Sequence, residues 1–184
     1  RCNVANSDIG VVAPVAITKT TPTNKSGSTR FATACGITCR RANTIMNVTT
    51  QDAQLAVFAN AAAQLEPGGC FVVEVIVPQL RRVPPGETAR VFTLDPDHVG
   101  IETFDDVAGQ IAWSHHWIEA DGRLVRHSAP YRYVWPSELD LMARIAGFRL
   151  QDRWAGWDRA PFTSDSQSQV AVFVNEGQIA DVFV

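Results

Sequence analysis

Two adjacent histidines, His115 and His116, are the side chains best suited to proton transfer, because an imidazole titrates near neutral pH. They lie in a segment of mixed polar and apolar residues, which predicts a strand, so their side chains point to opposite faces. At most one of them can therefore face a substrate. Two interpretations stay open: one histidine is a general base, or both are polar strand residues.

The spacing of these histidines does not favour a metal site. The chain has four histidines: His98, His115, His116 and His127. They have no coherent ligand spacing with any cysteine, and Cys35 and Cys39 have the wrong spacing for a zinc knuckle. We therefore expect no metal centre.

Three aromatic residues form a second candidate site. Tyr131, Tyr133 and Trp135 occupy alternate positions of a predicted strand and so share one face. Aromatic walls exclude water and suit a flat or sugar-like small molecule. The alternative is that they pack in the core, Trp135 against the helix that follows it.

A helix, a turn and a buried strand come before these residues. Apolar side chains on an alanine-rich background predict a helix over 52–65, with Thr50 or Asp52 as its cap. The Pro-Gly-Gly turn at 67–69 ends it, and the apolar run 71–77 is typical of a strand buried on both faces. This order is half of a βαβ unit and predicts an α/β protein with a parallel sheet.

The later elements have a different pattern. Extended segments at 98–105, 110–119 and 123–134 predict an antiparallel insertion with one solvated face, and Asp121-Gly122 is a hairpin signal. A helix is expected with Ser137 as its N-cap, ending before Gly147. Strands over 148–154 and 169–174 follow as a closing antiparallel pair.

Composition limits the class of protein. The 184 residues contain no apolar run long enough for a bilayer, and the formal net charge is −3, which gives no argument for nucleic acid. No serine lies in a Gly-x-Ser-x-Gly elbow, which argues against a hydrolase. We expect a soluble, cytoplasmic protein with neither a membrane nor a nucleic-acid partner.

Residues 1–42 differ in composition from residues 43–184. The first stretch carries six basic residues, one acidic residue and one aromatic residue, Phe31. The second carries ten basic and eighteen acidic residues and nearly all the large apolar side chains. We therefore treat 1–42 as an atypical leader and 43–184 as the α/β domain.

From Asn43 onward the chain resembles the C-terminal half of a class I S-adenosylmethionine-dependent methyltransferase. The resemblance rests on NTIMN at 43–47, LEPGG at 65–69 before strand 71–77, YVWPSELDLM at 133–142 and AGF at 146–148. It implies a Rossmann-like sheet, incomplete at its N-terminus, with an antiparallel insertion and a closing strand pair.

The resemblance also implies roles for single residues. Asn43 and Thr44 correspond to the end of the family's fourth strand, where they would contact the methionine or adenosyl part of the cofactor. In the alternative, Asn43 and Asn47 only satisfy backbone groups in a turn. The insertion after the fifth strand supplies acceptor contacts in this family, so Tyr131, Tyr133 and Trp135 would roof the acceptor pocket.

One feature of the family is missing. Residues 1–42 contain no acid- and glycine-rich cofactor loop, and the segment before Asn43 is a poor buried strand. Either the start is divergent, or the chain is a truncated or frame-altered fragment, which is the interpretation we favour. Sequencing the upstream DNA in all frames would separate these two.

The sequence therefore predicts S-adenosylmethionine-dependent methyl transfer to a small-molecule acceptor, without a metal and impaired by the missing loop. The alternative is a non-catalytic fragment or binding module that keeps the acceptor-side half of the fold. Cofactor binding discriminates between them.

Overall fold

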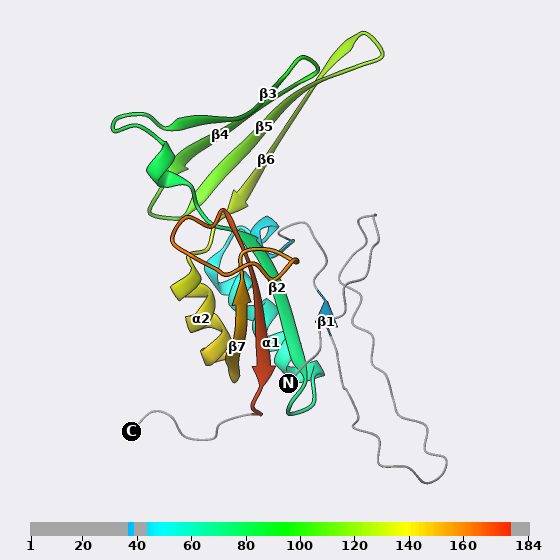
Figure 1. Ribbon diagram of the computed structural model, residues 1–184, viewed down its shortest axis with the longest axis vertical. Helices are drawn as coiled ribbons and strands as arrows, with labels where there is room; N and C mark the ends of the chain where they lie inside the picture. The colour runs from blue at the N-terminus through cyan, green and yellow to red at the C-terminus, as the bar shows by residue number, and fades with distance from the viewer. Residues whose placement is uncertain (1–36, 39–43, 178–184) are drawn as a thin grey trace.

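The computed structural model describes residues 37–38 and 44–177, which form two sheets and two α-helices (Figure 1). Sheet A has the order β1 (Ile37–Thr38), β2 (Cys70–Ile76), β8 (Ser168–Asn175) and β7 (Phe148–Trp154). Sheet B has the order β3 (Ala89–Asp95), β4 (His98–Asp106), β5 (Ile111–Ala120) and β6 (Arg123–Arg132). Sheet B projects from one end of sheet A.

Sheet A is the Rossmann-like part of the fold. Its closing strand pair follows the sequence prediction, but the expected parallel sheet is mostly antiparallel among the described residues, because only β1 and β2 pair in parallel. β1 pairs with β2 in parallel, as expected for a strand, a helix and a strand in succession. β8 pairs antiparallel with β2 and with β7, so the predicted strand 71–77 is central and the closing strand pair is confirmed. The predicted leader 1–42 lies outside the described residues except for β1.

Helix α1 (Gln51–Gln64) begins and ends as its sequence predicts. The Thr50 side chain caps it by accepting from the Ala53 N–H at 3.3 Å. After Leu65, Gly68 takes a positive φ of 86°. A Cβ at Gly69 would lie 2.9 Å from the Glu66 carbonyl oxygen, so the second glycine is also required for this tight turn.

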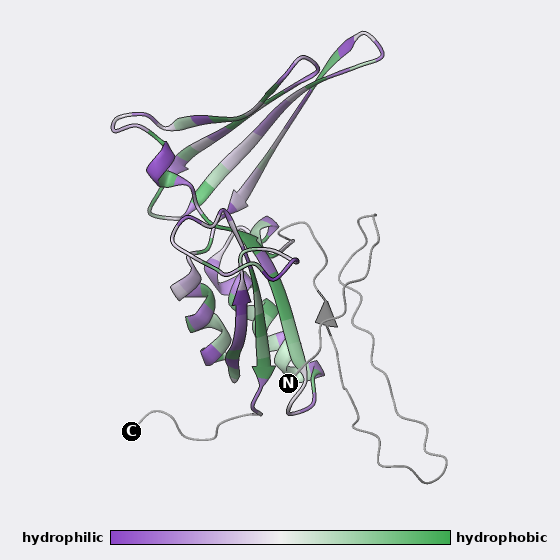
Figure 2. Cartoon of the chain, viewed as in Figure 1, coloured by the Kyte–Doolittle hydropathy of each residue, from purple (hydrophilic) through white to green (hydrophobic). Residues whose placement is uncertain are grey.

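The core lies between sheet A and its two helices. Phe58 of α1 packs edge-on against Phe71 of β2 and Phe173 of β8, with ring centroids 5.2 and 5.8 Å apart. The other face of the sheet packs against Trp154 and Trp157. Burial on both faces explains the mostly hydrophobic colour of β2 and β8 in Figure 2.

Helix α2 (Pro136–Ile145) begins two residues earlier than expected. Its N-cap is Trp135 with Pro136 at the first helical position, so the prediction of Ser137 as the cap is wrong. Proline fits there because its missing N–H is not needed in the first turn. Gly147 follows the helix with a φ of 84°, as its sequence position predicts.

Sheet B is the predicted antiparallel insertion, with one strand more than expected. β3 was not predicted, because it lies at the sheet edge and most of its side chains are partly or fully exposed. The β5–β6 hairpin turns at Asp121 and Gly122, whose φ angles of 53° and 71° suit a type I′ turn. Two short 3-10 helices, η1 (Thr44–Asn47) and η2 (Leu80–Arg82), complete the fold.

The two faces of sheet B have different surroundings. Phe104 of β4 and Ala112 of β5 are buried and belong to the core cluster, so we call their side the core-side face. The opposite side, which carries Trp113 and Trp117, is the outer face. No helix of the described residues is long and apolar enough to cross a membrane.

Candidate functional site

Thr44 begins η1, the turn that leads from β1 to α1. The Ile45 and Met46 side chains are buried in the core, whereas Thr44 and Asn47 are exposed. Apolar anchors on one side of a single turn thus leave the polar residues at the surface. Asn43, the other predicted cofactor contact, lies outside the described residues.

The buried amide of Gln54 holds η1 against the rest of the molecule. Its Nε2 donates to the Ile45 carbonyl at 3.1 Å and to the Arg132 carbonyl at 3.3 Å. Its Oε1 accepts from Nη1 of Arg132 at 2.5 Å. One side chain of α1 therefore bonds to η1 and to the last residue of β6.

Arg132 is the centre of a set of side chains that we call the polar junction. Its members are Gln51, Gln54, Gln110, Arg132 and Glu138. Nη2 of Arg132 donates to Glu138 Oε1 at 2.7 Å and to Gln110 Oε1 at 3.0 Å. The junction thereby joins sheet B to the first turns of both helices.

Glu138 is the anion of this junction. Burial acts to raise the pKa of its carboxyl, but hydrogen bonds from Arg132, Gln110 and Gln51 outweigh burial and lower the pKa. The carboxylate is therefore ionised opposite Arg132. Glu138 and Arg132 thus form a partly buried ion pair.

The two predicted histidines lie on opposite faces of sheet B. His115 is on the outer face, where its ring stacks on Trp113 with an interplanar angle of 7° and its Nδ1 lies 2.8 Å from Ser128 Oγ. Its Nε2 lies 3.4 Å from Thr103 Oγ1. Both nitrogens of His115 thus have partners on neighbouring strands.

His116 is on the core-side face. Its Nδ1 lies 2.9 Å from His98 Nε2, and its Nε2 lies 2.8 Å from Ser114 Oγ. Burial lowers the pKa of His116, and the charges of His98, His127 and His115 lower it further. A neutral imidazole with both nitrogens hydrogen-bonded must break a bond before it can accept a proton.

Tyr131 lies on the same face, closer to the core. Its ring crosses β5 beside Ala112, and its hydroxyl donates to Glu102 Oε1 on β4 at 2.9 Å. Arg90 of β3 pairs with Glu102 Oε2 at 2.5 Å. Burial, and then the charge of Glu102, raise the pKa of Tyr131, so its phenol stays neutral and remains a donor.

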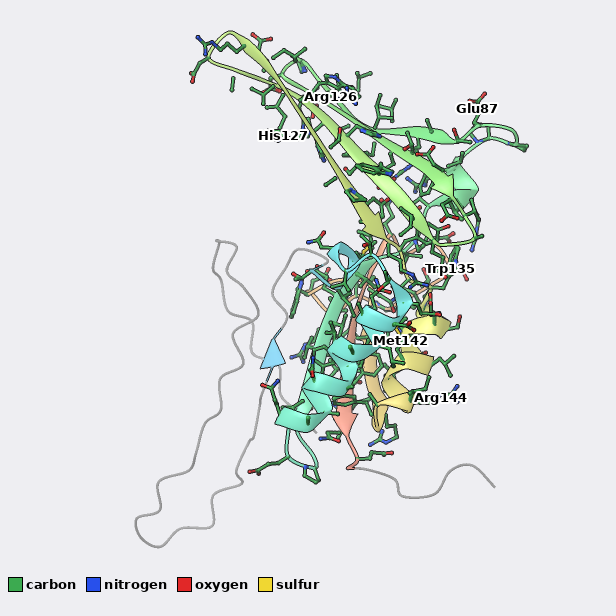
Figure 3. All side chains as sticks on the ribbon, turned by 180° about the vertical axis from the view of Figure 1, so that it is seen from behind. Glu87, Arg126, His127, Trp135, Met142 and Arg144 are labelled. Atoms are coloured by element: carbon green, nitrogen blue, oxygen red, sulfur yellow. The ribbon has the colours of Figure 1, made fainter. Side chains whose placement is uncertain are left out.

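Tyr133 and Trp135 are not alike in exposure. Tyr133 is 1% exposed, packs against Phe104, and has a hydroxyl with no hydrogen-bond partner among residues 37–38 and 44–177. Burial raises the pKa of Tyr133, and Asp106 adds to the effect. Trp135 is 38% exposed and lies where sheet B meets α2, as Figure 3 shows from behind.

The structure therefore brings the predicted site residues together in pairs and not in one cluster. Tyr131 and His116 share the core-side face of sheet B, and Tyr133 and Trp135 contact each other with ring centroids 6.3 Å apart. Thr44 lies on η1, next to the polar junction. The described residues contain no group of side chains arranged to hold a metal ion.

Sequence reasoning missed Glu102, Gln54 and Arg132. Gln54 interrupts the apolar side of α1, and a polar residue at a helix position facing the core is a usable signal. Its partner Arg132 lies 78 positions away, so no local pattern identifies the pair.

Solved structures similar to this chain are methyltransferases. The CcbJ methyltransferase of Streptomyces caelestis is 33% identical, with a TM-score of 0.63 over 73% of this chain and 58% of that one. An S-adenosylmethionine-dependent methyltransferase of Clostridium acetobutylicum is 10% identical, with a TM-score of 0.58 over 73% and 56%. S-adenosylmethionine-bound CalS10 of Micromonospora echinaspora, an amino pentose methyltransferase, is 17% identical, with a TM-score of 0.51 over 73% and 55%.

The chain thus spans less than three fifths of the length of each of these enzymes. No family model matches the sequence, and neither does any curated protein.

Proposed function

This chain has the class I S-adenosylmethionine-dependent methyltransferase fold, and from this premise we propose that it serves methyl transfer from S-adenosylmethionine to a small-molecule acceptor. The observation that carries the proposal is the 33% identity to the CcbJ methyltransferase over 73% of the chain. Sheet A, η1 and the closing strand pair are the parts of that fold described here.

The donor side of the site is η1. Ligands of α/β sheets bind beyond the carboxyl ends of the parallel strands, and η1 follows β1 and contacts β2 there. Thr44 is exposed at this place while Ile45 and Met46, which follow it, are buried, and this fits a residue that faces a ligand. Asn43 and Thr44 are our candidates for holding S-adenosylmethionine, which supplies an electrophilic methyl group on a sulfonium.

The acceptor side is the core-side face of sheet B. Tyr131 lies there at the end nearest the core, where the buried carboxylate of Glu102 holds its hydroxyl, and its partly exposed ring can contact an acceptor. CalS10 is by its description an amino pentose methyltransferase, which supports a sugar-like acceptor and agrees with two aromatic candidates: the exposed Trp135, and the buried Tyr133 that packs against it. Their part is to orient the acceptor and exclude water.

The two histidines have lesser parts in this proposal. His116 shares the core-side face but lies four residues beyond Ala112, or about 13 Å along β5. It would contact the far end of an acceptor, whereas His115 faces away. His116 thus remains the better candidate of the two.

Binding of S-adenosylhomocysteine, measured by titration calorimetry on the purified chain, tests this proposal. We expect weak binding, because residues 1–42 contain no glycine-rich cofactor loop. Thr44→Trp should weaken it about tenfold or more by filling the donor site, whereas Thr49→Trp, at another exposed threonine, should leave it unchanged. No binding by a folded chain would overturn the proposal and favour a non-catalytic binding module.

A further inference from the structure

Gln54 has hydrogen-bonding partners that its own helix does not require. It is 0% exposed on a helix side that otherwise presents Phe58 and Ala61 to the core. A buried amide is costly there unless its groups are paired, and an apolar side chain of similar size would fill the same space. The position is therefore better explained by what the amide holds than by packing.

What it holds is the backbone directly after Thr44. The Ile45 carbonyl accepts from Gln54 Nε2 at 3.1 Å and also from the Val48 N–H at 3.2 Å. The first bond ties η1 to α1, and the second closes the turn itself. Without the Gln54 donor, η1 would be held in place only by the hydrogen bond of its own turn and by the burial of the Ile45 and Met46 side chains.

The same amide also reaches the acceptor-side sheet. Gln54 exchanges hydrogen bonds with both the guanidinium and the carbonyl of Arg132, at the end of β6. Arg132 is 4% exposed and is fixed in turn by Glu138 and Gln110. Through Arg132, the position of η1 is set relative to sheet B as well as to α1.

We infer that Gln54 is a positioning residue, which holds the donor-side turn η1 at a fixed place relative to the acceptor-side sheet through Arg132. This inference rests on the proposed function and deepens it. In-line methyl transfer needs donor and acceptor at a defined distance and angle, and small displacements are costly in rate. Gln54 contributes to that geometry without touching either substrate.

The test compares Gln54→Glu with a control variant on β8, at a residue whose side chain bonds to the C-terminal end of α1. A carboxylate at position 54 still accepts from Arg132 but cannot donate to the Ile45 carbonyl. The control is Asn175→Asp, because Asn175 is also buried and donates to the Ala62 and Leu65 carbonyls at 3.2 and 2.7 Å. Each variant loses two hydrogen bonds that a side-chain amide donates to backbone carbonyls. Only Gln54→Glu loses one that reaches η1.

Two readouts are measured on each chain: amide hydrogen exchange without ligand, and the affinity for S-adenosylhomocysteine. Gln54→Glu should speed exchange over 45–48 and weaken the affinity, each about tenfold. Asn175→Asp should speed exchange only near 62–69 and leave the affinity unchanged. Gln54→Met, which lacks both donor and acceptor, should repeat the first result if the glutamate variant does not fold.

The outcomes separate this inference from the proposed function. Unchanged exchange at 45–48, or unchanged affinity, in both Gln54 variants would overturn the positioning role alone. An unaltered chain that does not bind S-adenosylhomocysteine would overturn the proposed function, and this role with it. The exchange data still report in that case whether the amide holds the turn.

Discussion

Tyr131 and Tyr133 are only two positions apart, yet their hydroxyls are in opposite states. The Tyr131 hydroxyl donates to a buried carboxylate, whereas the buried Tyr133 hydroxyl has no partner in the part of the chain that the structure describes. Removing a bonded group costs its bond and leaves Glu102 short of a donor. Removing an unbonded hydroxyl relieves a desolvation cost.

Tyr131→Phe and Tyr133→Phe should therefore change stability in different ways. We expect Tyr131→Phe to lower the free energy of unfolding by about 1–2 kcal/mol, and Tyr133→Phe to leave it unchanged or raise it by up to about 1 kcal/mol. Urea unfolding followed by tryptophan fluorescence measures both. Equal losses in the two variants would mean that the Tyr133 hydroxyl has a bonded partner in solution.

Sequence reasoning at the residue scale identified groups by their type and could not identify their partners. His115 and His116 were correctly expected on opposite faces, because side-chain alternation is a local property of a strand. The pairs of Tyr131 with Glu102 and of Arg132 with Gln54 join residues 29 and 78 positions apart. Only the fold brings such residues together.

Among the elements, sheet B depends on one glycine for the packing of its edge. A Cβ on Gly100 of β4 would lie 2.5 Å from the ring of Phe92 on β3. That ring meets the His116 ring edge-on, with centroids 5.4 Å apart. The edge strand can lay Phe92 across β4 only because position 100 has no side chain.

Gly100→Ala should displace Phe92 and lower the free energy of unfolding by about 1–3 kcal/mol, although alanine suits a strand better than glycine. Ala129→Val is the control, because Ala129 is exposed on β6 of the same sheet. We expect it to stay within about 0.5 kcal/mol of the original chain. Thermal or urea unfolding checks both, and a neutral Gly100→Ala would show that the ring is not held there.

Element prediction succeeded where burial imposes a strong pattern and failed where it does not. β2 and α1 lie within one residue of their predicted bounds, because a buried run and a capped amphipathic segment have few alternatives. β3 was missed because it is an edge strand with both faces partly exposed to solvent, so its sequence lacks a clear alternation of polar and apolar residues. The start of α2 was placed late because Pro136 fits the first turn as well as Ser137 fits a cap.

For the molecule as a whole, the polar junction connects the two sheets through the ion pair of Arg132 and Glu138. Arg132 comes from sheet B, and Glu138 lies in the first turn of α2, which packs on sheet A. The pKa of Glu138 is lower in the folded chain than its ordinary value. Its contribution to stability is therefore present above the unfolded pKa of about 4.3 and is lost as the pH falls through the lower folded value.

The free energy of unfolding should accordingly fall as the pH drops below about 5, and part of that fall should be absent in Glu138→Gln. At pH 7 this variant should lose about 3 kcal/mol, because Arg132 then lacks its anion. Glu176→Gln, at an exposed pair with Arg149, should cost less than about 1 kcal/mol. A pH profile of Glu138→Gln parallel to that of the original chain would contradict the assignment.

The attachment of sheet B also bears on how acceptor range could diverge. Its four strands lie in a single stretch between β2 and α2, and among the described residues its side-chain hydrogen bonds to the two α-helices come from Gln110 and Arg132. The whole of sheet B could therefore be replaced by another inserted sheet without changing the order of the other elements. A graft that keeps glutamine and arginine at these two positions, together with Gly100 and the buried Phe104 and Ala112, would keep this attachment, while the solvent-accessible positions of its core-side face could be redesigned for a new acceptor.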